Sequence, residues 1–460
     1  MNPEKTITKS MTRREWLEKG AKAVLAMSIG GKLFARSTGA RSLSAAPGPA
    51  TSRKFPAKFL WGAATAAHQV EGNNINSDNW LLERAPNTMY QEPSGDACDH
   101  YHLYEQDINQ LADLGFNAYR FSIEWARIEP EKGFFSRAEL EHYRRMLEVC
   151  HKRGLTPLVT YSHFTLPKWF AYQGAWENPE SVDLFASYSE KATKHLGDLI
   201  SYASTFNEPD IPYLFHWINL PNAPAGMDLS GIMAAQKAGL RQYLNAPQFS
   251  SFLIGDAAKT RENMMAAHTQ ARAAIKSARN IPVGLTLAME DDQQEGSDRG
   301  AAEKQADVYI PWLKLAQGDD FIGVQTYTRS RIAARALAPP QGAELTQMGY
   351  EFYPEALEHT VRFAAKETGV PVIVTENGIA TEDDSRRMEY IHRSLAGLKR
   401  CIDDGVDVRG YIHWSLLDNF EWIFGYRPKF GLIAVDRTTQ KRTVKPSAVT
   451  LGQIAQSNSL

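Results

Sequence analysis

The chain alternates short apolar runs with amphipathic stretches eight times, and this repeat constrains its fold more than any other feature. Two of the amphipathic stretches, residues 137–154 and 185–200, have the spacing of surface helices. Strands that alternate with helices indicate a parallel sheet, and eight such units predict an α/β protein built as a (β/α)8 TIM barrel. The strand-like runs are residues 59–68, 118–123, 155–161, 202–206, 283–289, 321–327, 371–375 and 408–415.

Two glutamates follow two of these runs directly. Glu208 lies in TFNEP, after the run 202–206, and Glu376 lies in VTENG, after the run 371–375. Barrel enzymes carry their chemistry at the C-terminal ends of the strands, so both carboxylates are expected at the same mouth. Hydrolysis of a glycosidic bond needs such a pair, because one carboxyl group protonates the leaving oxygen while the other attacks or activates water.

Composition and charge exclude several other classes of protein. No stretch of 18 or more apolar residues occurs, so we expect no membrane span. Residues 1–50 hold nine Lys and Arg against three Asp and Glu; of the chain totals of 51 and 53, this leaves 42 basic and 50 acidic residues beyond them. A body with a net charge of −8 argues against nucleic acid and other polyanionic partners.

The cysteines and histidines carry no recognisable site. Cys98, Cys150 and Cys401 are odd in number and far apart, so we expect no disulfide. The histidines are too scattered for a ligand cluster, and the sequence predicts neither a metal ion nor a cofactor. The oligomeric state is not determined by these features.

The first fifty residues differ from the rest. Arg13 and Arg14 precede a modestly apolar stretch, residues 23–31, and a segment of small residues follows. This pattern resembles a twin-arginine export leader, and it predicts a periplasmic or extracellular protein. We therefore predict a leader and linker over residues 1–50 and a single barrel domain over residues 51–460. A basic tail is the alternative.

One long connection interrupts the repeat. Residues 210–255 are rich in Pro, Gly and Asn and separate the run 202–206 from its helix. Long loops on the catalytic face of a barrel commonly form walls of the substrate site. We expect this excursion to influence what binds beside the two carboxylates.

From about Phe55 to Pro446 the chain resembles glycoside hydrolase family 1, the β-glucosidase-like retaining glycosidases. The resemblance rests on the motifs FLWGAATAAHQVEG, YRFSIEWARIEP, TFNEP, MGYEFYP, VTENG, WSLLDNFEW and GYRPKFGL. It implies that Glu208 is the acid/base and that Glu376 is the nucleophile. It also implies that Arg120 and Tyr327 hydrogen-bond the nucleophile, and alternation along the run 118–123 indeed puts Arg120 on one face with Ser122.

The resemblance also assigns residues to the sugar. Asn207 matches the residue that bonds the 2-hydroxyl, and Trp414 matches the platform under the apolar face of the ring. The residues that match the group gripping the other hydroxyls are Gln69, His163, Glu421 and Trp422. Each of these aromatic and polar residues, taken alone, could be an ordinary core residue. A carboxylate at 421 would repel a phosphate, which favours an unphosphorylated sugar.

The chain departs from the family pattern at several positions. His68, Phe164-Thr165, Gln325-Thr326 and Pro428-Lys429 replace the usual residues. Glu124 stands where Ser is frequent. We expect Glu124 to form a structural ion pair with Arg120 or Arg127, and the alternative is that it tunes the surroundings of the nucleophile.

Three functions follow as hypotheses. The first is a retaining exo-β-glycosidase that releases terminal β-glucosyl, β-galactosyl or β-fucosyl units from a small-molecule glycoside or oligosaccharide by double displacement. The second is a transglycosidase, which passes the same glycosyl unit to a sugar or lipid acceptor. The third is a non-catalytic sugar-binding module, which the presence of both glutamates disfavours.

Overall fold

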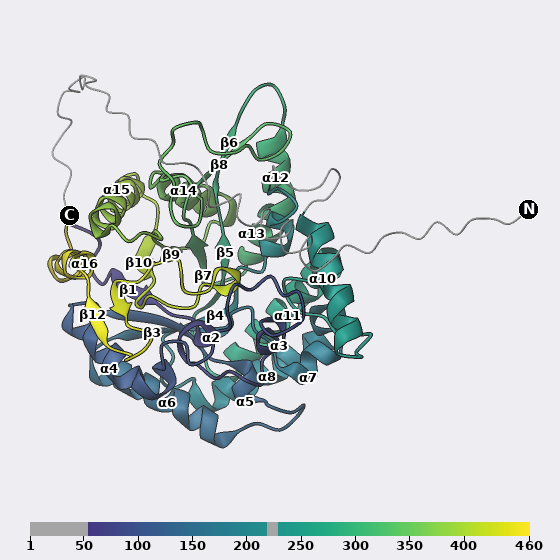
Figure 1. The fold of residues 1–460 in the computed structure, drawn as a ribbon. Coiled ribbons are helices and arrows are strands. Elements are labelled where there is room, and N and C mark those ends of the chain that lie inside the picture. Colours follow the sequence, from purple (N-terminus) through teal and green to yellow (C-terminus); the bar gives the residue numbers. More distant parts are fainter. Residues whose placement is uncertain (1–53, 219–228) are drawn as a thin grey trace, which may run out of the picture.

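The structure is a computed structural model that describes residues 54–218 and 229–460 (Figure 1). Eight parallel strands close into a barrel, as predicted. In chain order these strands are β1 (Leu60–Ala64), β2 (Ala118–Ser122), β3 (Thr156–Ser162), β4 (Tyr202–Asn207), β5 (Val283–Ala288), β7 (Phe321–Gln325), β9 (Val372–Asn377) and β10 (Val408–Trp414). Around the barrel their order is β1-β10-β9-β7-β5-β4-β3-β2.

Helices cover the outside of the barrel. A helix on the outside of the barrel follows each strand, namely α4 (His100–Asp113), α6 (Arg137–Lys152), α8 (Ser181–Leu196), α11 (Ala257–Ala278), α13 (Ile310–Ala316), α14 (Ala356–Thr368), α15 (Asp384–Asp403) and α16 (Pro446–Ser457). Further helices lie in the connections, namely α2 (Ala67–Val70), α3 (Asp78–Leu82), α5 (Trp125–Ile128), α7 (Lys168–Tyr172), η1 (Ala175–Glu177), α9 (Ile211–Leu214), α10 (Leu229–Tyr243), α12 (Gly300–Val308) and η2 (Trp422–Phe424).

The first predicted strand is too long. β1 ends at Ala64, and the remainder of the run 59–68 turns into the single-turn helix α2, whose residues are all buried. The run is apolar because the chain stays buried after it leaves the barrel, and apolar character alone does not distinguish a strand from a buried helical turn. The predicted helix over 185–200 likewise begins earlier, at Ser181.

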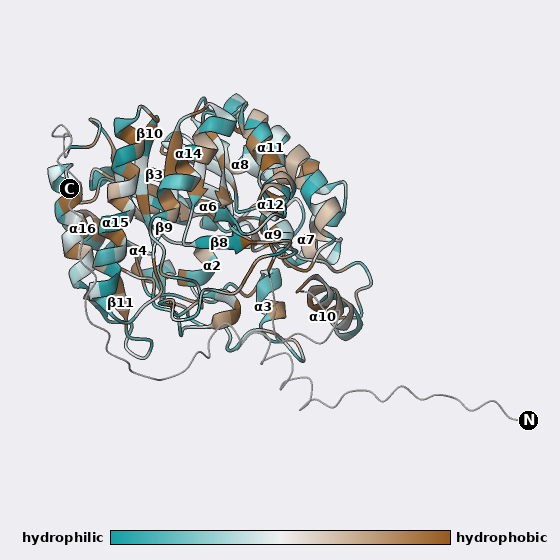
Figure 2. Cartoon of the chain, turned by 90° about the horizontal axis from the view of Figure 1, so that it is seen from above, coloured by the Kyte–Doolittle hydropathy of each residue, from teal (hydrophilic) through white to brown (hydrophobic). Residues whose placement is uncertain are grey.

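The packing of the barrel explains the pattern of apolar residues. A small cluster of side chains, including Leu60, Leu158, Phe321, Ile373 and Ile412, fills the barrel interior. A much larger cluster lies between the strands and the surrounding helices. The helices are accordingly hydrophobic on one side and hydrophilic on the other (Figure 2). Strands buried on both faces read as continuous apolar runs in the sequence.

The strand register becomes irregular where the chemistry is expected. The pairing of β4 with β5 shifts between Ser204 and Asn207. The pairing of β7 with β9 shifts between Val324 and Gln325, where the partner of Gln325 is Glu376. Such bulges re-aim side chains at the end of a strand. Both irregularities lie at the C-terminal ends of the strands, which is the mouth that the sequence predicts.

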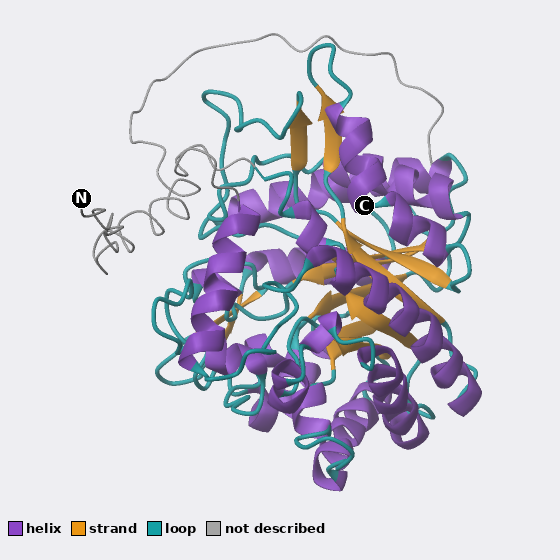
Figure 3. Ribbon diagram, turned by 90° about the vertical axis from the view of Figure 1, so that its right-hand side faces the viewer, coloured by secondary structure: helices purple, strands orange, loops and turns teal. Residues whose placement is uncertain are grey.

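Two features build up the mouth. The short strands β6 (Asp291–Gln294) and β8 (Arg329–Ile332) pair in parallel and project beyond the barrel strands (Figure 3). The predicted excursion 210–255 contains α9 and α10, while residues 219–228 lie outside the described part of the chain. Side chains of α10 pack against the first loop and the end of the excursion in a separate apolar cluster that includes Leu82, Met233, Leu240 and Phe249.

The remaining elements lie near the C-terminus. β11 (Ile433–Val435) and β12 (Arg442–Val444) form an antiparallel pair.

The predicted leader at residues 1–50 lies outside the described residues. Over the residues that are described, no helix is both long enough and apolar enough to cross a membrane.

Candidate active site

The two motif glutamates both lie at the barrel mouth. Glu376 belongs to β9, while Glu208 follows β4 directly and has a φ of +48°. Its backbone N–H donates to the Thr286 carbonyl at 2.8 Å, which holds this left-handed conformation against its cost of about 1–3 kcal/mol. The exposed fractions of the two residues are only 8% and 4%. The site therefore offers two carboxyl groups in largely dry surroundings.

Glu376 is surrounded by hydrogen-bond donors. Arg120 Nη1 donates to its Oε1 at 2.5 Å, and the Tyr327 hydroxyl donates to its Oε2 at 2.5 Å. Arg120 is buried and reaches across the barrel from β2, as the alternation along that strand predicts. A cation and a hydroxyl on the two oxygens favour the ionised form of a carboxyl group.

Asn207 is oriented by the same arginine. Arg120 Nη2 donates to Asn207 Oδ1 at 2.5 Å, and Gln325 Nε2 donates to the same oxygen at 3.0 Å. These bonds assign the oxygen and nitrogen of the amide. The buried Asn207 Nδ2 is thereby left without a partner among the described residues. The amide thus presents a free N–H donor beside Glu376, as a group that binds a hydroxyl requires.

The two carboxyl groups have different surroundings, and their pKa values follow from them. Burial raises the pKa of Glu208 well above its usual value, and the negative charge of Glu376 raises it further. Burial also raises the pKa of Glu376, but there the charge of Arg120 and the Tyr327 hydroxyl oppose the shift. A single proton shared by the pair is therefore held by Glu208, since only Glu376 has a cation on its oxygen.

A second group of polar side chains lies between β1 and the segment after β10. Gln69 Nε2 donates to Glu421 Oε2 at 3.1 Å and to the Phe420 carbonyl at 2.8 Å. Trp414 Nε1 donates to the other oxygen of Glu421 at 3.1 Å. Burial raises the pKa of Glu421 to about 8. Gln69 Oε1 is buried and has no partner among the described residues, so this group presents acceptors as well as donors.

Aromatic rings flank this group. His163 stacks on Trp414, with 5.9 Å between ring centroids, and on Trp422, with 6.2 Å. Burial and the charge of Arg120 hold the pKa of His163 well below its usual value, so its ring is neutral. His68 also stacks on Trp422, with 5.6 Å between ring centroids, and its Nε2 contacts Glu83 at 2.6 Å. These flat faces suit the C–H-rich face of a pyranose.

The excursion between β4 and α11 reaches this aromatic wall. Phe252 stacks on Phe164 with 5.3 Å between ring centroids, and Phe164 lies 5.2 Å from Trp422. Phe164 has a φ of +72°, in the left-handed region. The side chain next to His163 is therefore supported by a segment that the sequence identified only as a long loop.

The predicted ion pair of Glu124 is wrong. Within the described residues Glu124 has no cationic partner, and Arg127 pairs with Glu71 at 2.7 Å instead. Glu124 caps the short helix α5, where its Oε1 accepts from the Ala126 N–H at 3.2 Å. Its Oε2 accepts from the Thr165 hydroxyl at 2.7 Å. Glu124 therefore bonds both the first turn of α5 and the neighbouring turn that contains Thr165. It directly precedes the helix, and helix N-termini favour carboxylates.

Some residues of the site escaped the sequence analysis. Gln325 was noted only as a departure from the family pattern, although it ends β7 and precedes Tyr327 by two residues. Asn419 accepts from Gln69 Nε2 at 3.1 Å and belongs to the WSLLDNFEW motif. Position on an inward strand face was the available signal for Gln325. The bonds of Asn79 and Glu83 are to Tyr90, His68 and Ser94, mainly within the first loop.

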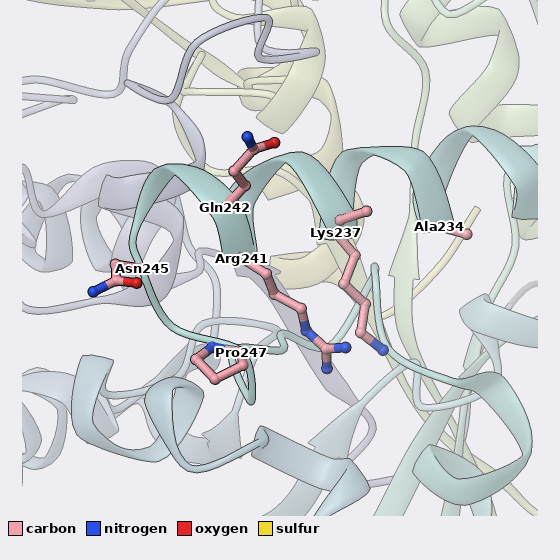
Figure 4. Close-up of a pocket in the computed structure, with 7 residues that line it drawn as sticks. Ala234, Lys237, Arg241, Gln242, Asn245 and Pro247 are labelled. Carbon is pink, nitrogen blue, oxygen red and sulfur yellow. The ribbon is translucent and has the colours of Figure 1, made fainter. Parts of the chain in front are cut away.

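Other features of the described chain lie apart from this site. No group of three or more His, Cys, Asp or Glu side chains in residues 54–218 and 229–460 could hold a metal ion. A hollow of about 680 Å³ lies on α10 (Figure 4). Lys237 and Arg241 point to the same side of it, and Lys237 pairs with Glu177. None of the residues lining it belongs to the candidate site.

Two buried carboxyl groups at the mouth of a barrel, one of them paired with a guanidinium, are the arrangement that glycoside hydrolases use. The sequence model described as Glycosyl hydrolase family 1 matches residues 51–312 and 313–460. The chain belongs to this family and is a glycoside hydrolase.

Characterised relatives extend over nearly the whole chain. The chain is 30% identical to "Beta-glucosidase A" of Acetivibrio thermocellus, over 88% of this chain and 98% of the relative. It is also 30% identical to "Beta-glucosidase A" of Thermotoga maritima, over 89% and 99%. The crystal structure of beta-glycosidase BGL167 is similar, with a TM-score of 0.84, 48% identity and coverage of 88% and 98%. The Thermotoga maritima β-glucosidase in complex with glucoimidazole has a TM-score of 0.77 at 27% identity, with coverage of 89% and 100%.

Proposed function

We propose that this protein is a retaining exo-β-glycosidase that releases a terminal β-glycosyl unit by double displacement. Glu376 attacks the anomeric carbon, and Glu208 donates its proton to the leaving oxygen, so that the bond to the leaving group breaks. Water then attacks the glycosyl–enzyme, and Glu208 takes a proton from that water while Glu376 leaves. The released sugar keeps the β configuration.

One observation carries this proposal. The two buried carboxyl groups have opposite surroundings, because Glu376 receives the Arg120 guanidinium and the Tyr327 hydroxyl, whereas Glu208 receives neither. Environments that separate the pKa values of two carboxyl groups assign their roles as nucleophile and acid. Asn207 supports the assignment, since it shares Arg120 with the nucleophile and keeps a free N–H that can donate to a 2-hydroxyl.

We further propose that the sugar is unphosphorylated. Glu421, Gln69 and Trp414 form one hydrogen-bonded group whose only ionisable member is a carboxyl group. A phosphate at this position would be repelled by any charge on Glu421. The related enzyme of Thermotoga maritima binds glucoimidazole, which supports a glucosyl unit among the accepted sugars.

The test uses purified protein and a panel of aryl β-glucoside, β-galactoside, β-fucoside and β-mannoside, with a Glu376→Ala control. We expect release of the aryl group that disappears in the control. NMR of the first product should show the β-anomer, and initial release of the α-anomer would contradict retention. Added alcohols should divert part of the glycosyl unit, which measures the balance between hydrolysis and transglycosylation.

We propose separately that residues 1–50 direct export by the twin-arginine route. The support is the Arg13-Arg14 pair ahead of a short apolar stretch. Fractionation of cells that express the full chain should place the activity outside the cytoplasm. In an Arg13→Lys, Arg14→Lys variant the activity should remain in the cytoplasm. Equal export of wild type and this variant would contradict the proposal.

A further inference from the structure

A carboxylate outside the catalytic pair is held rigidly beside the mouth. Glu290 follows β5, which neighbours β4 in the barrel, and β4 carries Glu208 at its end. The Glu290 backbone N–H donates to the Tyr309 hydroxyl at 3.2 Å. Its Oε2 accepts from Lys304 Nζ at 2.5 Å. Both the backbone and one carboxylate oxygen of Glu290 are therefore fixed by buried groups.

Lys304 is a buried cation between two carboxylates. It lies on α12, its side chain is 1% exposed, and it also contacts Asp292 Oδ1 at 2.6 Å. The negative charge of Glu290 raises the pKa of Lys304 well above its usual value, against the effect of burial. The ammonium group is thus favoured in its charged form, and its contact with Oε2 holds the Glu290 carboxyl group in one position.

The two carboxylates on Lys304 differ in their access to solvent. The side chain of Asp292 is fully buried, whereas that of Glu290 is 28% exposed. Burial also raises the pKa of Asp292 to about 7. Glu290 Oε1 makes no hydrogen bond to any residue in the described part of the chain. Glu290 is therefore the member of this cluster that can bind something from outside.

The charges of Glu290 and Lys304 also act on groups that the catalytic pair influences or adjoins. Burial raises the pKa of Tyr350, and the negative charges of Glu290, Glu208 and Glu421 raise it further. On the other side, burial raises the pKa of Asp210, two residues after Glu208, to about 8, while the charge of Lys304 opposes this shift. α12 also packs against α9, the helix that follows Glu208.

We infer that Glu290 determines specificity for the leaving group, a role that rests on the proposed glycosidase activity. The carboxylate lies on the side of Glu208, the residue that protonates the leaving oxygen, and its Oε1 accepts hydrogen bonds from that part of the substrate. Leaving groups with donors there, such as sugar hydroxyls or an ammonium group, are favoured. Leaving groups with a carboxylate there are disfavoured, because two like charges in a partly buried site repel each other.

The experiment compares matched substrates on one enzyme. Wild type and Glu290→Gln are each assayed on 4-(aminomethyl)phenyl and 4-carboxyphenyl β-glucosides. For each protein, kcat/KM on the ammonium substrate is divided by kcat/KM on the carboxylate substrate. We expect the ratio to favour the ammonium substrate in wild type and to fall about tenfold in the variant, as one charge contributes across a partly solvated site. Because the ratio is internal to each preparation, any loss of folded protein cancels.

A matched control removes the same charge next to the cluster. Glu303 precedes Lys304 on α12 and is exposed, so Glu303→Gln should leave the ratio as in wild type. An equal ratio in wild type and Glu290→Gln would overturn the inference while leaving the glycosidase proposal intact. If wild type hydrolyses neither these substrates nor any aryl β-glycoside of the panel above, the proposed function itself fails. Cellobiose gives a second readout, since Glu290→Gln should lose more kcat/KM on it than on the neutral phenyl glucoside.

Discussion

The side of the site that is proposed to hold the sugar and the side that is proposed to hold the leaving group are built differently. On the sugar side, Gln69, Trp414 and Glu421 bond one another, and strand ends of the barrel carry or flank them. On the leaving-group side, Glu290 is fixed by Lys304 from the separate helix α12. The proposed sugar side thus includes the end of a barrel strand, at Trp414, while the other side depends on a lysine from a connecting helix.

This difference implies that the barrel strands fix the positions of the side chains at their ends, whereas the connections can change in length and composition. Strand ends in a closed barrel have few alternative positions, because every strand is paired on both sides. Loops tolerate changes in length and composition more readily. Substitutions on the sugar side should therefore affect all substrates alike, and substitutions on the other side should change the preference among leaving groups.

The largest expected effect comes from Glu376→Ala, which removes the attacking group from both halves of the reaction. We expect kcat to fall by about 10⁵-fold, as expected when a positioned nucleophile is lost. Sodium azide should restore turnover and yield the α-glycosyl azide, because azide attacks from the vacated face. Full activity without azide, in a variant with a wild-type circular dichroism spectrum, would rule out this residue as the nucleophile.

Glu208→Ala should distinguish the leaving groups. Loss of a general acid costs about 10²–10⁴-fold, and the loss should be greatest for glycosides whose leaving group is a poor one. The 2,4-dinitrophenyl glucoside needs little protonation and should keep most of its rate in the first step. A uniform loss across leaving groups of different pKa would contradict the assignment of Glu208 as the acid.

Glu421→Ala tests whether the sugar side acts on all substrates alike. A hydrogen bond to a charged or strongly polar group contributes about 1.5–3 kcal/mol, so kcat/KM should fall about 10- to 100-fold. The factor should be the same for phenyl glucoside and cellobiose. Gln69→Ala in the same background should add less than it costs alone, since the two side chains share a hydrogen bond. Additive losses would mean that they act independently.

The pH dependence follows from the opposite roles of the pair. Burial raises the pKa of Glu208, and the reaction needs its protonated form, so activity is present below this pKa and is lost as pH rises through it. On the acid side, activity is lost as Glu376 takes up a proton. Each limb of log kcat/KM should have unit slope, a tenfold change per pH unit. In Glu208→Gln the alkaline limb should disappear for activated aryl glucosides, and its persistence would assign it to another group.

The smallest effect is expected for Glu124→Ala, which lies on neither side of the site. The cap of α5 is lost, which should lower the free energy of unfolding by about 1 kcal/mol in urea titrations. The pH profile of kcat/KM should not move. Thr165→Val, which removes only the other hydrogen bond of Glu124, is the matched control. A shifted profile in Glu124→Ala would revive the hypothesis that this carboxylate tunes the nucleophile.

The repeat of strands and helices was sufficient to predict the barrel, since all eight strand-like runs became barrel strands. The error at the first run arose because buried helical turns and buried strands are equally apolar. The ion pair predicted for Glu124 was wrong because charge and proximity in sequence do not reveal that a turn of helix begins there. β6 and β8 were not predicted, as four-residue polar strands have no distinctive pattern.

By itself the sequence determined the number and order of the strand–helix units and the two carboxylates at the ends of two strands. These follow from local patterns and short motifs. Only the tertiary structure decided which carboxylate receives a cation, because Arg120 and Glu376 are 256 residues apart and meet only when the barrel closes. The same holds for Glu290, whose lysine comes from a separate helix. Long-range contacts of this kind depend on register and burial, which no local pattern encodes.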